Sequence, residues 1–93
     1  MVVRVRLVGV LKALALGKDY LELNNANNVR DVVNGLKSVN DKLFRRVFDA
    51  SRNDLMPDIY IAVNNVDIRL LKGLDTPIND NDEVLIIAYI HGG

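Results

Sequence analysis

The sequence predicts one α+β domain in which a main helix packs across one face of a mixed β-sheet. Three patterns indicate this fold class. Apolar and polar residues alternate near the N-terminus, apolar residues recur at helical spacing in the middle, and a continuous apolar run lies near the C-terminus. Alternation is the period of a strand, whereas recurrence at every third or fourth residue is that of a helix. The 93 residues suffice for one small domain with a thin core.

A β-hairpin is expected at the N-terminus. Residues 2–10 are interpreted as a strand with one wet face, because apolar residues alternate there with Arg4 and Arg6. Residues 19–23 alternate in the same way and are expected to form the second strand. The segment between them, residues 11–16, is bracketed by glycines and is predicted to be a loop.

The middle of the chain predicts the main helix. Asn28 is a good N-cap residue, and residues 29–39 follow it with apolar side chains on one face. Gly35 and several valines are mediocre helix formers, so packing onto the sheet must hold this helix together. A second, shorter helix is expected over residues 43–48, followed by a polar loop over residues 51–58. The apolar positions of the main helix are Val29, Val32, Val33, Leu36 and Val39.

The last third of the chain predicts three more strands. Residues 59–63 form a short strand, and Asn64 and Asn65 favour a tight turn because asparagine tolerates a positive φ. Residues 66–70 are the expected return strand, and residues 71–81 are irregular. With the N-terminal hairpin, the crossing helix and a last strand that returns beside the first, this order indicates a β-grasp arrangement.

The final strand, residues 84–90, is apolar on both faces, as expected for a central strand. Only one face can lie under the main helix in so small a domain. The other face is either an interface for a partner or is covered by the second, shorter helix. The side chains expected to face the main helix are Val84, Ile86, Ala88 and Ile90. The candidate partner-binding residues are Leu85, Ile87 and Tyr89, with Arg4 and Arg6 at the rim.

The charge balance argues against nucleic acid as a direct partner. The 12 Lys and Arg side chains are balanced by 12 Asp and Glu side chains, whereas phosphate binding needs a concentrated excess of positive charge. The nearest basic cluster lies around Arg45 and Arg46, with Lys42 and Arg52 nearby, and it is interleaved with aspartates. We interpret it as a solvated face of mixed charge.

Composition also narrows the chemistry. Because cysteine is absent, the chain has no disulfide, thiolate metal site or cysteine nucleophile. No Ser-His-Asp or metal-spaced cluster is present, so the chain is not expected to be an enzyme on its own, and neither a metal nor a bound cofactor is expected. Asp80, Asp82 and Glu83 lack the ligand periodicity of a calcium loop and are interpreted as a turn. No signal peptide or apolar run of membrane-spanning length is visible, so a cytoplasmic location is expected.

The sequence ends in His91, Gly92 and Gly93, which are expected to form a flexible tail beyond a domain over residues 1–90. Glycine has no Cβ, so a Gly-Gly tail is thin and can enter a channel that any side chain would block. The carboxylate of Gly93 is therefore a candidate chemical handle, and Gly92 is expected to provide clearance. His91 is a candidate hydrogen-bond donor to a partner, against the simpler interpretation of an exposed residue without a chemical role.

The order of these motifs resembles the ubiquitin-like sulfur carriers, which include the small subunit of molybdopterin synthase (MoaD), ThiS and the ubiquitin-related modifiers. The family pattern has a Val-Asn-Gly turn, a Gly-Asp segment before the last strand and a terminal Gly-Gly. In this sequence residues 63–65 correspond to the Val-Asn-Gly turn and residues 80–84 to the Gly-Asp segment. Asn65 and Asn81 replace the glycine of each motif. Asparagine is the next-best residue for a positive φ, so the same turns remain accessible.

The resemblance implies a mechanism. An ATP-dependent adenylyltransferase of the ubiquitin-activating type adenylates the carboxylate of Gly93, sulfur is installed to give a thiocarboxylate, and a partner enzyme uses it. ATP is consumed by the activating enzyme and no cofactor is bound by the chain itself. The implied partner is the large subunit of molybdopterin synthase, with this chain as the small subunit in molybdenum cofactor biosynthesis.

Two alternatives stay open. A ubiquitin-related modifier would be conjugated to lysines or would supply sulfur for tRNA thiolation, and the ending Ile-His-Gly-Gly looks closer to that group because molybdopterin-type members often carry prolines there. A β-grasp interaction module with an inert tail is the alternative from a different class. ThiS itself is expected to fit less well, since its members are shorter and usually lack an insertion like residues 43–58.

Overall fold

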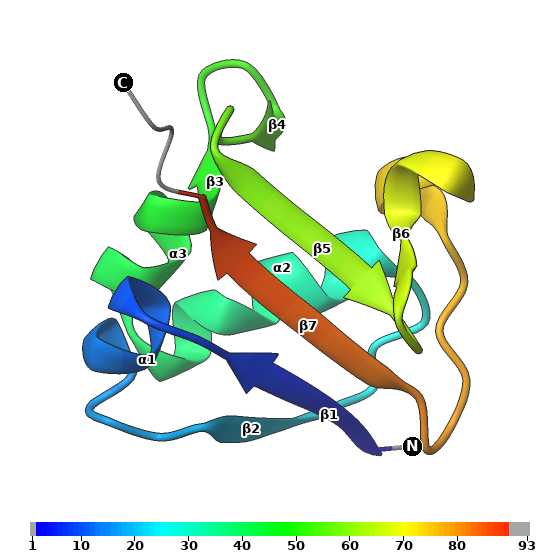
Figure 1. Ribbon diagram of the computed structural model, residues 1–93, viewed down its shortest axis with the longest axis horizontal. Coiled ribbons are helices and arrows are strands. Elements are labelled where there is room, and N and C mark those ends of the chain that lie inside the picture. The colour runs from blue at the N-terminus through cyan, green and yellow to red at the C-terminus, as the bar shows by residue number, and fades with distance from the viewer. Residues whose placement is uncertain (1, 90–93) are drawn as a thin grey trace.

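A computed structural model describes residues 2–89, which form a five-stranded sheet with helices packed on one face (Figure 1). The strands of this sheet are β1 (Val2–Leu7), β2 (Tyr20–Asn24), β5 (Ile59–Val63), β6 (Val66–Asp67) and β7 (Glu83–Ala88). Their order is β2-β1-β7-β5-β6, and β7 runs parallel to β1 and antiparallel to β5. The mixed sheet and the last strand beside the first, both predicted from the sequence, are confirmed.

The connection between β1 and β2 is not the loop predicted for residues 11–16. β1 ends at Leu7, earlier than expected, and a short helix, α1 (Val10–Leu14), follows it. Leu11 and Ala15 lie four residues apart, and both are buried in the core. Residues at this spacing share one face of a helix. Burial of that face stabilises a helix that is too short to form alone, which explains why local sequence favoured a loop.

The main helix, α2 (Val29–Val39), and its N-cap are as predicted. The side-chain oxygen of Asn28 accepts a hydrogen bond from the backbone N–H of Asp31 at 2.8 Å, which satisfies a donor that the first turn leaves open. A Cβ at Gly35 would lie 3.0 Å from Cδ1 of Leu23 on β2. The glycine therefore allows a close approach between the helix and the sheet, which compensates for its poor helix propensity.

The second helix, α3 (Asp41–Val47), starts slightly before the predicted residues 43–48 and is capped by Asn40. Its buried side chains join the same core as those of α2, on the same side of the sheet. The alternative in which this helix covers the opposite face is therefore wrong. None of the helices within residues 2–89 is long and apolar enough to cross a membrane. The α3 side chains in the core are Leu43, Phe44 and Val47.

The polar segment predicted as a loop over residues 51–58 contains part of a small two-stranded ribbon. Strand β3 (Phe48–Asp49) pairs antiparallel with β4 (Asp54–Leu55). The carboxylate of Asp49 accepts a hydrogen bond from the backbone N–H of Ser51 at 3.0 Å, which stabilises the turn between the two strands. The polar residues thus build a tight turn, whereas their composition alone is also compatible with an irregular loop.

The asparagines at the family's glycine positions adopt the expected conformation. Asn65 has a φ of 69° and Asn81 has a φ of 70°. Asn64 links the two turns, because its side chain donates to Asp82 at 2.8 Å and accepts from the backbone N–H of Glu83 at 3.0 Å. Asp82 therefore has the turn role predicted for it.

The return strand predicted over residues 66–70 is shorter than expected. It ends at Asp67, whose side chain accepts a hydrogen bond from the backbone N–H of Arg69 at 2.8 Å. This cap starts a 3-10 helix, η1 (Ile68–Leu70), and a second one, η2 (Gly73–Asp75), follows in the irregular segment. A capping aspartate competes with strand pairing, which explains the early end of β6.

Candidate functional site

The two faces of β7 differ as the sequence predicted. Val84 and Ile86 are completely buried in the core under α2. Leu85 and Ile87 are half-buried, and Tyr89, just after β7, is 41% exposed. In Figure 1 the helices of the described residues lie on one side of the sheet, so its other side has no helix over it. The assignment of the two faces is therefore confirmed as far as Tyr89.

The uncovered side of the sheet brings together the candidate residues from β1 and β7. Arg6 lies beside Leu85 in the parallel β1–β7 pair, and Tyr60 lies opposite Ile87 in the β5–β7 pair. Residues in register point to the same side of a sheet, so these side chains are neighbours. We call this surface the outer face. It includes Arg4, Arg6, Tyr20, Glu22, Tyr60, Glu83, Leu85, Ile87 and Tyr89.

The centre of the outer face is apolar and lies next to the point where the last described residues leave the sheet. The rings of Tyr60 and Tyr89 meet edge to face, with their centroids 5.8 Å apart. Leu85 and Ile87 lie on the adjoining strand. A half-buried apolar surface with aromatic residues at its edge is typical of a protein–protein interface.

One side of the outer face carries charges of both signs, because Glu22 on β2 and Glu83 on β7 lie in register with Arg4. The guanidinium carbon of Arg4 lies 4.3 Å from the ring centroid of Tyr20, and that of Arg6 lies 6.0 Å from it. Both contacts fall within the range of cation–π interactions, so the ring on β2 orients two positive charges. A partner surface with both acidic and basic groups would complement this side of the outer face.

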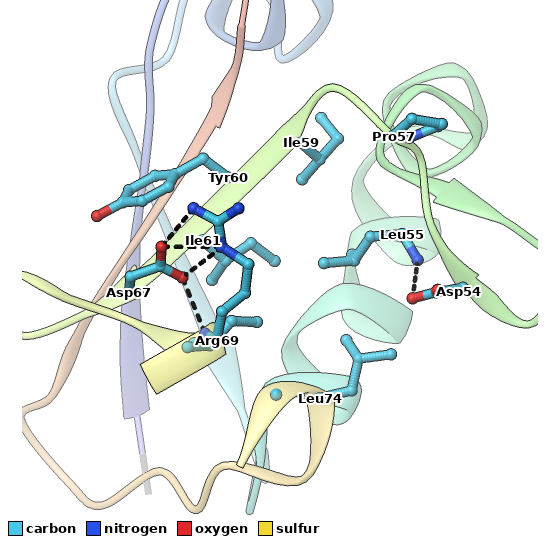
Figure 2. A pocket seen from close by; sticks show the side chains of 11 residues that line it. Asp54, Leu55, Pro57, Ile59, Tyr60, Ile61, Asp67, Arg69 and Leu74 are labelled. Atoms are coloured by element: carbon cyan, nitrogen blue, oxygen red, sulfur yellow. Dashed lines mark hydrogen bonds and ion pairs between the residues drawn. The ribbon is translucent and has the colours of Figure 1, made fainter. Parts of the chain in front are cut away.

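A pocket of about 310 Å³ adjoins the outer face at Tyr60, between β5, η1 and β4. Figure 2 shows Asp67 and Arg69 beside the Tyr60 ring, with Leu55 and Leu74 across from them. The carboxylate of Asp67 accepts hydrogen bonds from Nη2 and Nε of Arg69 at 2.6 and 2.9 Å. These bonds lower the pKa of Asp67 and raise that of Arg69. One wall of the pocket is therefore the Asp67–Arg69 ion pair, whose charges offset each other, and the opposite wall is apolar.

The structure brings together five of the eight predicted site residues. Arg4, Arg6, Leu85, Ile87 and Tyr89 all belong to the outer face. The predicted tail residues His91, Gly92 and Gly93 lie outside the described residues, as does Ile90.

The basic cluster around Arg45 forms ion pairs, as its interpretation as a mixed-charge face predicts. Nε of Arg45 lies 3.0 Å from the carboxylate of Asp41. Nε of Arg52 lies 2.9 Å from the carboxylate of Asp49. Because each arginine has an acidic partner close by, the positive charge of the cluster is largely offset locally.

Sequence reasoning missed three residues of this region. Tyr20 could have been found, because the hairpin register places it opposite Arg6. Tyr60 could have been found in the same way from its place on the strand beside β7. Arg69 gave no sequence signal, since its position depends on the 3-10 turn that Asp67 caps.

The sheet order, with β7 between β1 and β5 and α2 across one face, defines a β-grasp, ubiquitin-like domain. The ThiS family matches residues 5–93. The chain therefore belongs to the ThiS family, and with it to the ubiquitin-like sulfur carriers and modifiers.

Solved structures and a curated protein are similar to this chain. A chain of the BexX/CysO complex of Amycolatopsis orientalis superposes with a TM-score of 0.84 at 22% identity, over 98% of this chain and 99% of that chain. Small archaeal modifier protein 1 of Methanosarcina acetivorans has a TM-score of 0.75 at 30% identity, over 99% and 96% of the two chains. A ubiquitin-related modifier 1 homolog of Drosophila willistoni is 46% identical over 37 residues, which are 40% of this chain and 37% of that protein. The aligned segment thus spans little more than a third of that relative.

Proposed function

We propose that this chain is a sulfur carrier whose Gly93 carboxylate is adenylated by an ATP-dependent activating enzyme and converted to a thiocarboxylate. The observation that carries the proposal is the outer face, whose apolar centre extends to Tyr89, just after β7. A partner that binds this face would contact Tyr89, which precedes Gly93 in the sequence by four residues. The family match, which runs to residue 93, supports the same assignment.

The division of chemistry follows from the properties of a carboxylate. A carboxylate is a poor electrophile until one of its oxygens becomes part of a good leaving group. The activating enzyme transfers AMP from ATP to one carboxylate oxygen and releases pyrophosphate. Hydrosulfide then attacks the carbonyl carbon and displaces AMP, which leaves the thiocarboxylate. The chain itself contributes binding and orientation: the outer face docks, Gly92 gives clearance, and His91 is a candidate donor to the partner.

The docking surface has two parts with different roles. Leu85, Ile87 and Tyr89 form the apolar centre and are the proposed anchors, because buried apolar side chains at the middle of an interface carry most of the affinity. Arg4 and Arg6 lie at the rim together with Glu22 and Glu83, where charges chiefly set the rate of encounter and the choice of partner. CysO of Amycolatopsis orientalis is found in a complex with BexX, which supports partner docking as the mode to test here.

For the acceptor of sulfur, we propose the large subunit of molybdopterin synthase, with this chain as the small subunit. A location in the cytoplasm, where ATP is available to the activating enzyme, is part of this proposal. A second candidate is a ubiquitin-related modifier, joined to lysines or supplying sulfur for tRNA thiolation. The 37-residue segment that is 46% identical to a ubiquitin-related modifier 1 homolog favours this second candidate.

The test is ATP–pyrophosphate exchange with the adenylyltransferase from the same cell. Exchange that depends on this chain supports the proposal, whereas no exchange above the enzyme alone contradicts it. The activated chain is then offered separately to a molybdopterin synthase large subunit, a tRNA thiolation enzyme and a lysine-containing protein. The acceptor that receives sulfur or forms a covalent conjugate decides between the two candidates.

A further inference from the structure

The structure holds Tyr89 in place by its backbone and by its side chain. The backbone N–H of Tyr89 donates a hydrogen bond to the carbonyl oxygen of Asp58 at 2.7 Å, which extends the β5–β7 ladder by one step. The Tyr89 ring rests against Tyr60. Tyr89 is thus the point from which residues 90–93 extend.

The residue that holds the Tyr89 backbone is itself held by an arginine from α3. Arg46 donates two hydrogen bonds to the carboxylate of Asp58, from Nη1 at 2.9 Å and from Nη2 at 2.5 Å. Both side chains are about three-tenths exposed or less, so the pair is partly shielded from water. Its hydrogen bonds to Asp58 raise the pKa of Arg46. Paired bonds of this geometry fix orientation as well as charge.

The segment between these two residues is anchored to the core. Val47, the last residue of α3, is completely buried, and its carbonyl oxygen accepts a hydrogen bond from the backbone N–H of Met56 at 2.8 Å. The carbonyl oxygen of Met56 in turn accepts from the backbone N–H of Ile59 at the start of β5. Arg46 and Asp58 therefore join the two ends of a braced segment.

We propose that the Arg46–Asp58 pair is a clamp that fixes the place and direction in which residues 90–93 leave the domain, and that it thereby positions Gly93 for activation. The inference rests on the proposed function, in which Gly93 is the reacting residue. Four residues span at most about 14 Å when fully extended. With so short a reach, a shift of the Tyr89 backbone changes where the carboxylate can arrive. Arg46 and Asp58 are positioning residues, because they act through Tyr89.

A purely structural ion pair would give a different result from a clamp. If the pair only stabilised the fold, its loss would lower the melting temperature and would accelerate amide exchange throughout β7. A clamp at Tyr89 instead predicts a local change at that amide and a change in turnover. Binding of the activating enzyme to the outer face should stay the same, since the apolar anchors are untouched.

The experiment compares the full chain with three variants. Arg46→Ala removes the clamp, Arg46→Lys keeps the charge without the paired geometry, and Arg45→Ala removes a neighbouring ion pair with Asp41 that lies on the same helix. Amide hydrogen exchange is measured at Tyr89 relative to Ile87. ATP–pyrophosphate exchange gives KM and kcat for the activating enzyme.

The clamp predicts that Arg46→Ala speeds exchange of the Tyr89 amide about tenfold relative to Ile87, the factor that corresponds to about 1.4 kcal/mol. It also predicts a kcat about tenfold lower at unchanged KM. Arg46→Lys should recover part of both effects, and Arg45→Ala should show neither. An unchanged Tyr89 amide in Arg46→Ala, or an equal effect in Arg45→Ala, overturns the clamp. If exchange of the Tyr89 amide is faster in Arg46→Ala but kcat is unchanged, the proposal that the pair positions Gly93 is overturned.

The two proposals fail in distinguishable ways. If the unaltered chain supports no pyrophosphate exchange, the proposed function is contradicted, while the Tyr89 amide still decides whether Arg46 holds the backbone there. If the unaltered chain is activated and the Arg46→Ala chain is activated equally well, the proposed function stands and the positioning role falls.

Discussion

Placing a carboxylate on either face of β7 separates the core from the proposed interface. Ile86 is completely buried, so Ile86→Asp forfeits about 1.5–3 kcal/mol of apolar burial. The cost of burying a carboxyl group without a partner adds several kcal/mol. The whole stability of a chain of this length is roughly 5–14 kcal/mol, so the Ile86→Asp chain is expected to be largely unfolded.

The adjacent change should spare the fold and weaken binding. Ile87 is half-buried on the outer face, where an aspartate can reach water, so Ile87→Asp should cost about 1 kcal/mol of stability. Loss of an interface anchor costs about 2 kcal/mol of affinity, which is a roughly 30-fold weaker Kd for the activating enzyme. Circular dichroism melts and titration calorimetry measure the two quantities.

A matched control comes from an exposed apolar residue elsewhere. Leu16, after α1, is 85% exposed, and Leu16→Asp should change neither stability nor binding appreciably. If Ile87→Asp unfolds the chain and Ile86→Asp only loses the partner, the two faces have been assigned the wrong way round. If both unfold it, the outer face is structural and the interface lies elsewhere.

Three further predictions concern glycines. Deleting Gly93 should leave the melting temperature unchanged and abolish pyrophosphate exchange, and exchange at the unaltered rate would contradict its role. Gly92→Val should also melt normally but lose activation or transfer, because a β-branched side chain would obstruct a narrow channel; full activity in both steps would refute that clearance. Gly35→Ala should lower the free energy of unfolding, measured by chemical denaturation, by about 1 kcal/mol. The new Cβ would lie 3.0 Å from Cδ1 of Leu23, and the cost of this crowding should exceed the gain in helix propensity. A more stable Gly35→Ala chain would show that α2 can shift to accommodate the methyl group.

Features that depend on local periodicity could be predicted from the sequence. The two faces of β7 follow from strict alternation, and the Asn28 cap follows from one residue type followed by a helical pattern. The positive φ of Asn65 and Asn81 follows from the side chain itself. These features are set by neighbours in the chain, so the sequence carries them directly.

Features that depend on tertiary packing could not be predicted. The helix α1 is too short for periodicity to reveal, and burial of Leu11 is what stabilises it. The Arg46–Asp58 pair joins residues 12 positions apart, and nothing in the local pattern gives the direction of either side chain. The outer face could be predicted because strand alternation defines it, whereas the pocket beside it depends on the 3-10 turn after β6.

The chemical state of the last glycine tests the central claim most directly. The chain is incubated with its adenylyltransferase, ATP and a sulfur donor. The masses of the intact protein and of its C-terminal peptide are then measured by mass spectrometry. The account predicts a mass increase equal to the replacement of one oxygen by sulfur, located at Gly93 and dependent on ATP. An unchanged carboxylate at Gly93, under conditions in which the same enzyme activates a known carrier, would contradict it.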